Sequence, residues 1–241
     1  MRFTLFFLSG LFFLSPSFCQ SVQNNSLANL QVKNAIGLYN NFTDGNAPIF
    51  NGTEYLYYTF KKEGDPFFVS GAYSIGWVGY EGRVYGPESL FYDIQRNQLV
   101  ILNADSVSNI VMLNEFVDSF YLWGHTFISL KEDYKKNLYN TGFYDRLYNG
   151  HVQLFARRIK TMYDKIEDLT IVRIFTSQDR FYIYKDGLYY LVTNKKEVLH
   201  LFADKKHEIK KMMRKEHLNL RRKNFQTSIV KVTAFYDEQT H

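Results

Sequence analysis

The 241-residue sequence contains only one cysteine, Cys19, which lies at the end of an apolar N-terminal stretch. The stretch has a positive start at Met1-Arg2, and its apolar run from Phe3 to Leu14 is too short to cross a bilayer as a helix. These features predict a signal peptide, residues 1–19, and small residues at Ser17 and Cys19 predict cleavage before Gln20. Lipidation of Cys19 is the competing interpretation, and the bulky Phe18 disfavours it.

Cleavage at this point would leave a mature chain without cysteine. Such a chain can form no disulfide, and it has no thiolate nucleophile and no cysteine ligand for a metal. An exported protein held together by its core alone fits the periplasm or outer membrane of a Gram-negative cell better than a small disulfide-stabilised secreted domain.

Motifs for common chemistries are also missing. The chain has no G-x-S-x-G, no Walker loop and no G-x-G-x-x-G that opens a helix. His207-Glu208 begins like the H-E-x-x-H zinc motif, but Lys211 stands where the second histidine belongs. The sequence therefore predicts no catalytic residue, no cofactor and no metal site.

Aromatic residues, in contrast, are abundant: 18% of the chain, with 19 Tyr and 22 Phe. This bias favours strands, where aromatic side chains cover a pleated surface. Residues 66–102 read as consecutive strands with a tight turn at Glu81-Gly82, and Asp186-Gly187 predicts a similar turn. Gly124-His125 is typical of a type II′ turn, with glycine in the first central position.

Further strands are predicted towards the end of the β region, at 171–175, 180–184, 188–193 and 198–202, with turns at 177–179 and 194–196. Such short connections exclude a parallel α/β sheet, which needs crossover helices. The predicted fold is all-β or β-rich α+β: a curved antiparallel sheet, half-barrel or sandwich of about ten strands with a C-terminal helical pair.

The pattern changes at Asp204, a predicted N-cap, and Asn224 is predicted to cap a second helix with an apolar stripe. The predicted organisation is a signal peptide at 1–19, a flexible leader at 20–36, an antiparallel β domain at 37–203 and basic helices at 204–241 that pack on the sheet.

The only conspicuous charge feature is the stretch 195–223, which has eleven basic and four acidic residues, a net +7 against +5 for the whole chain. It is either the solvated outer face of the helices or a contact surface for an anionic membrane or an acidic partner. The export signal disfavours nucleic acid. The candidate surface residues are Lys205, Lys206, Lys210, Lys211, Arg214, Lys215, Arg221 and Arg222.

A second candidate site lies in the predicted sheet. Polar and aromatic side chains on adjacent segments could converge there, although ordinary cross-strand charge pairing explains the same pattern. Its candidate residues are Tyr144, Tyr148, Arg157, Arg158 and Lys160.

An ordered series of short motifs spans nearly the whole predicted mature chain. They are N-G-x-E-Y (51–55), G-D-P-F-F (64–68), Y-E-G-R-x-Y (80–85), L-F-Y-D (90–93), G-H-T-F (124–127), G-F-Y-D-x-L-Y-x-G (142–150) and A-R-R-x-K (156–160). With the basic helical tail, the series resembles a family of exported, β-rich proteins of Bacteroidota-type Gram-negative bacteria. The resemblance implies an exported, single-domain protein and supplies no catalytic residues.

The leading functional hypothesis is a non-enzymatic envelope protein that binds a partner protein or another envelope component, with the basic helices as its contact surface. The alternative is a carrier that holds a lipid or another apolar ligand on a concave aromatic sheet face. An enzyme and an outer-membrane barrel are further alternatives; the basic helical C-terminus disfavours the barrel.

Overall fold

We describe the fold from a computed structural model, which defines residues 47–221 and 224–240. All of them belong to one unit of the chain, residues 36–241. The predicted signal peptide, its cleavage site, the flexible leader and Arg222 lie outside the described residues.

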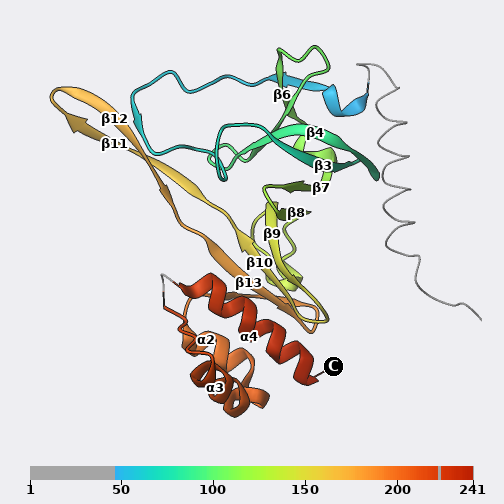
Figure 1. The fold of residues 1–241 in the computed structure, drawn as a ribbon, viewed down its shortest axis with the longest axis vertical. Coiled ribbons are helices and arrows are strands. Elements are labelled where there is room, and N and C mark those ends of the chain that lie inside the picture. The colour runs from blue at the N-terminus through green and yellow to red at the C-terminus, as the bar shows by residue number, and fades with distance from the viewer. Residues whose placement is uncertain (1–46, 222–223, 241) are drawn as a thin grey trace, which may run out of the picture. The chain divides into compact units, whose positions relative to one another are not determined.

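The central feature is an antiparallel sheet, which within the described residues has eleven strands in the order β1-β6-β5-β4-β3-β7-β8-β9-β10-β13-β14 (Figure 1). The sheet is not closed, because β1 and β14 form its two edges. The predicted β-rich class with a large antiparallel sheet is therefore confirmed. The strands are β1 (Gly52–Glu54), β3 (Ser74–Tyr80), β4 (Arg83–Asp93), β5 (Gln98–Leu102), β6 (Asn109–Met112), β7 (Val117–Leu122), β8 (His125–Leu130), β9 (Gly142–Asn149), β10 (Gln153–Arg157), β13 (Arg180–Lys185) and β14 (Leu188–Val192).

Two-residue turns join many neighbouring strands. Glu81-Gly82 and Asp186-Gly187 both have positive φ at both positions, as type I′ turns require, so these predicted turns are confirmed. The prediction at Gly124-His125 is wrong by one residue: the turn is Trp123-Gly124, with φ 52° and 82°, and His125 already pairs with Leu122. The glycine occupies the second central position there, so the turn is type I′ and not type II′.

A long hairpin extends from the main sheet. Its arms run from β10 into β11 (Lys160–Glu167) and back through β12 (Thr170–Ser177) into β13, with one continuous register. The Gln178 N–H donates to the Ile159 carbonyl at 2.9 Å and bridges the gap between the two paired portions. The predicted turn at 177–179 is therefore wrong, because this segment continues the arm. The outer portion forms a separate sheet with the short parallel strand β2 (Lys62–Glu63).

Helices follow β14 directly: α2 (Lys195–Leu201), α3 (Lys206–Lys215) and α4 (Phe225–Thr240). The predicted strand 198–202 is wrong, since its first four residues are in α2. The Asn194 side chain accepts hydrogen bonds from the N–H groups of Lys196 and Glu197, so the predicted turn at 194–196 is a helix N-cap. Asp204 does not cap α3; it lies in the short 3₁₀ helix η4 (Ala203–Lys205).

Short 3₁₀ helices also occur between strands, at η1 (Pro48–Phe50), η2 (Asn114–Phe116) and η3 (Tyr134–Lys136). No helix in the described part of the chain is both long enough and apolar enough to cross a membrane.

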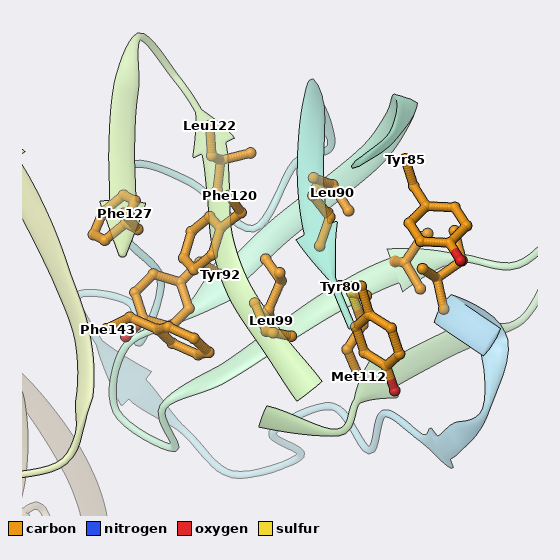
Figure 2. Close-up of a cluster of buried hydrophobic side chains, with 14 of the residues drawn as sticks. Tyr80, Tyr85, Leu90, Tyr92, Leu99, Met112, Phe120, Leu122, Phe127 and Phe143 are labelled. Atoms are coloured by element: carbon orange, nitrogen blue, oxygen red, sulfur yellow. The ribbon is translucent and has the colours of Figure 1, made fainter. Parts of the chain in front are cut away.

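One core lies on the face formed by β3–β9, and its aromatic rings fill it by packing on one another (Figure 2). Phe120 stacks on Phe127 with ring centroids 4.7 Å apart. Tyr92 contacts both rings edge-on, and Phe143 contacts Phe120 edge-on. The side chains of the sheet, together with η1 and the loop residue Phe68, thus cover this half of the sheet.

The second core is formed where α2, α3 and α4 all pack on one face of β10, β13 and β14. Figure 1 shows α4 beside β10 and β13, with α2 and α3 beyond it. Asp237 of α4 accepts hydrogen bonds from the N–H groups of His151 and Val152 and from the Tyr148 hydroxyl, which fixes the helix to the β9–β10 turn. Through these contacts the C-terminal helices pack on the sheet.

Candidate anion-binding site

A cavity of about 800 Å³ opens where the start of α2, one side of α3 and the segment after α3 meet. We call it the cationic pocket. Its lining residues are Lys195, Lys210, Met213, Arg214, His217, Leu218, Asn219, Leu220 and Arg221.

The helical period of α3 places the charges in this pocket. Ile209, Met212 and Met213 are buried against the core, so Lys210 and Arg214, one turn apart, lie on the exposed side of the helix. Beyond α3, the Leu218 N–H donates to the Met213 carbonyl at 2.8 Å and the His217 N–H to the Arg214 carbonyl at 3.3 Å. These bonds form a Schellman motif, which turns the chain back over the pocket.

His217 occupies the left-handed position of this motif, with φ 53°, where glycine is usual. A non-glycine residue in this conformation costs about 1 kcal/mol or more. Its imidazole consequently becomes part of the pocket lining.

The charge of the pocket is uncompensated. Four of its lining side chains are cationic, namely Lys195, Lys210, Arg214 and Arg221, and none of them is acidic. In the described part of the chain, none of these four cations is in an ion pair. The Arg214 Nε donates to the Lys210 carbonyl, at 3.3 Å. Clustered cations without counter-charge attract an anion.

The predicted basic surface is thus divided. Lys210, Arg214 and Arg221 line the pocket, whereas Lys206, Lys211 and Lys215 are exposed elsewhere on α3 and Lys205 is half-buried in η4. Lys195 and His217 were not among the predicted site residues. The turn at 216–217 brings His217 into the pocket, and Lys195 is the first residue of α2. Local sequence therefore places neither residue in the pocket.

The five residues of the predicted sheet site serve different contacts and do not form one site. The Tyr144 hydroxyl donates to the Asn140 carbonyl at 2.8 Å, and burial raises the pKa of Tyr144 to about 12. Burial, and then the Asp237 carboxylate, raise the pKa of Tyr148. The Lys160 ammonium donates to Asp65 at 2.9 Å, and Arg157 is half-buried.

Arg158, the remaining member, is the centre of a buried ionic cluster that the sequence did not predict. Its guanidinium binds the buried Asp145 carboxylate, with Nε at 3.0 Å, and Nη1 lies 2.5 Å from Asp179 and 2.8 Å from Gln226 of α4. His125 Nδ1 lies 2.8 Å from the same Asp145 oxygen. Because the cluster joins β8, β9, the hairpin and α4, we assign it a structural role.

No group of three or more His, Cys, Asp or Glu side chains within residues 47–221 and 224–240 is arranged to hold a metal ion. The fold itself is that of an open antiparallel β-sheet protein with a C-terminal helical layer. No family model matches the chain, and neither does any curated protein or solved structure.

Proposed function

We propose that this protein is an exported, non-enzymatic binding protein of the cell envelope, which holds an anionic group of an envelope component in the cationic pocket. The observation that carries the proposal is the set of four cations around one cavity whose lining contains no acidic residue. The envelope location rests on the predicted signal peptide and stays a prediction.

The pocket chemistry favours a phosphate or carboxylate. Arginine guanidinium groups bind both in a forked geometry, and lysine ammonium groups add charge without fixing orientation. Met213, Leu218 and Leu220 contribute apolar lining between the cations. This combination suits an anionic group that is carried on an acyl chain, as in an anionic lipid.

The alternative, an apolar-ligand carrier with a concave aromatic sheet face, has less support. The aromatic side chains on that face pack against one another, as Phe120, Phe127 and Tyr92 do (Figure 2). They fill a core on this face of the sheet.

The test is binding of residues 20–241 to phosphatidylglycerol vesicles, with phosphatidylcholine vesicles as the uncharged reference. We compare the wild type with the double variant Lys210→Glu/Arg214→Glu. Each cation near an anionic surface contributes about 1 kcal/mol, so losing two of them weakens binding by about 30-fold, and the two added negative charges weaken it further.

The matched control is Lys211→Glu/Lys215→Glu, which makes two charge reversals at the same spacing on the same helix, outside the pocket lining. We expect this variant to bind nearly as well as the wild type. Equal loss in both double variants would indicate diffuse attraction to α3 and contradict the pocket, as would equal binding to the two kinds of vesicle.

A further inference from the structure

The edge strand β14 carries no charged residue: its sequence is Leu-Tyr-Tyr-Leu-Val. Edge strands usually carry charges or proline, which prevent pairing with another chain. Within the described residues, no backbone hydrogen bond outside the β13–β14 ladder involves β14. One side of this apolar strand is therefore available for pairing.

The surface next to this edge is aromatic. Leu191 is 48% exposed, and the 3₁₀ helix η3 packs against β14 and carries Tyr134, which is 65% exposed. Tyr134 in turn contacts Tyr139, 59% exposed, with ring centroids 5.8 Å apart. The unpaired edge thus continues into an exposed aromatic patch, the kind of surface that marks protein–protein contacts.

A second copy of the same edge fits this strand. Two identical strands related by a two-fold axis pair in antiparallel fashion, and one residue then lies opposite its own copy. If the axis passes through Tyr190, all five residues pair: Tyr190 with Tyr190, Tyr189 with Leu191, and Leu188 with Val192. This register places no charge opposite a like charge.

The other edges of the described sheets are less suited to this pairing. Strands β1 and β2 have only three and two residues; β1 ends in Glu54, and both residues of β2 are charged. Strand β11 has two lysines and two acids among its eight residues, and charged side chains on an edge strand oppose pairing with another chain.

We infer that the protein forms a two-fold symmetric dimer in which β14 strands of two copies pair and join their sheets into one. In this dimer Leu191 is covered by Tyr189 of the second copy, on the face of the sheet that also carries Tyr182 and Tyr184. Five paired residues bury less than the roughly 1,200 Å² at which standard interfaces begin, so the aromatic patch must contribute further buried area, and we expect a weak dimer. This inference is independent of the cationic pocket.

The oligomeric state is measured by analytical ultracentrifugation of residues 20–241 at micromolar concentrations. We expect a dimer for the wild type and at least a tenfold weaker dimer for Leu191→Lys. The matched control is Ile171→Lys on β12, which introduces the same charge at a side chain of similar exposure, 56%, away from the edge. A monomeric wild type, or equal behaviour of the two variants, would overturn the inference.

The register is tested separately by cross-linking. Residues 20–241 contain no cysteine, so a single introduced cysteine can pair only with its copy. Tyr190→Cys places the two thiols on opposite residues, whose Cβ atoms lie about 5 Å apart, and dissolved oxygen should oxidise them to a disulfide. Leu188→Cys, which faces Val192 of the second copy, should remain uncross-linked. A disulfide in Leu188→Cys but not in Tyr190→Cys would contradict the two-fold axis at Tyr190.

Discussion

The inner and outer portions of the long hairpin share one register but differ in almost every other respect. In the inner portion, β10 and β13, Leu154 and Ile183 pair directly and are completely buried. In the outer portion, β11 and β12, Ile166 and Ile171 also pair directly, but they are 76% and 56% exposed. Backbone pairing alone therefore does not decide burial; the covering layer does. Helices cover the inner portion, whereas the outer one pairs with β2 and, among its described residues, only Val172 and Phe175 are buried.

The ion pairs show the same contrast. Arg158, at the junction of the two portions, is 7% exposed and binds the buried Asp145. Arg173, on β12, is 36% exposed and lies 3.3 Å from Asp164, itself 54% exposed. A buried charge without its partner is costly, whereas an exposed pair contributes little because water screens it.

The largest effect is expected for Arg158→Met. The change leaves Asp145 buried without its main counter-charge and removes the link to Gln226 of α4, so we expect a loss of about 3–5 kcal/mol in the free energy of unfolding. Urea denaturation measures it. Arg173→Met, the same change in the outer portion, should cost less than about 1 kcal/mol.

A double variant tests why Arg158→Met destabilises the protein. If the cost of Arg158→Met arises from the stranded carboxylate, then Asp145→Asn in the same chain should recover part of it. A cost for the double variant equal to the sum of the two single changes would show that the two residues act independently.

The next effect concerns the apolar pairs. Ile183→Ala deletes fully buried carbons beneath the helices and should destabilise the protein by about 2–4 kcal/mol, because the packed core collapses only partly around the cavity. Ile166→Ala should change the stability by no more than about 0.5 kcal/mol. Thermal and urea denaturation of both variants test the contrast, and comparable losses would mean that the outer portion is covered in solution.

Much of the sheet was predictable because strand and turn signals are local. Alternating aromatic residues and the Glu81-Gly82 and Asp186-Gly187 turns indicated hairpins directly. The outer hairpin turn was not predicted, because its left-handed residues are Asp168 and Leu169, with no glycine to mark them.

The predicted strand at 198–202 is part of α2, and the sequence does contain a signal for the start of this helix. The apolar run 198–202 resembles a strand, but Asn194 and Glu197 stand three residues apart, as in a capping box. In the structure, Asn194 caps the helix and Glu197 accepts a hydrogen bond from the Thr193 N–H at 2.7 Å. The helix start outweighs the strand propensity of the run.

The candidate sites were predicted only in part. The basic stretch included Lys210 and Arg214 because they are close in sequence, and helical periodicity could have placed them together. The Arg158 cluster assembles residues from β8, β9, the hairpin and α4, with up to 68 positions between hydrogen-bonded partners. Such contacts depend on the tertiary fold, which the sequence pattern does not specify.

The smallest expected effect is a gain in stability, whereas the effects above are losses. It concerns the turn at the tip of the outer portion. Leu169 has φ 64° in the type I′ turn, and its side chain is fully exposed. Leu169→Gly should remove the strain of the left-handed conformation, and no packing is lost. Part of this gain is offset because glycine makes the unfolded chain more flexible, so we expect a net gain of about 0.5–1 kcal/mol.

This gain should appear locally, since the outer portion can open without unfolding the core. Amide hydrogen exchange in β11 and β12 should slow by about two- to fivefold, because 1.4 kcal/mol corresponds to a factor of ten. Asp168→Gly at the neighbouring position should gain less, since aspartate tolerates positive φ better than leucine. Faster exchange in Leu169→Gly would mean that the leucine side chain makes a stabilising contact in solution, and the outer portion would then be held by a partner as the inner one is held by its helices.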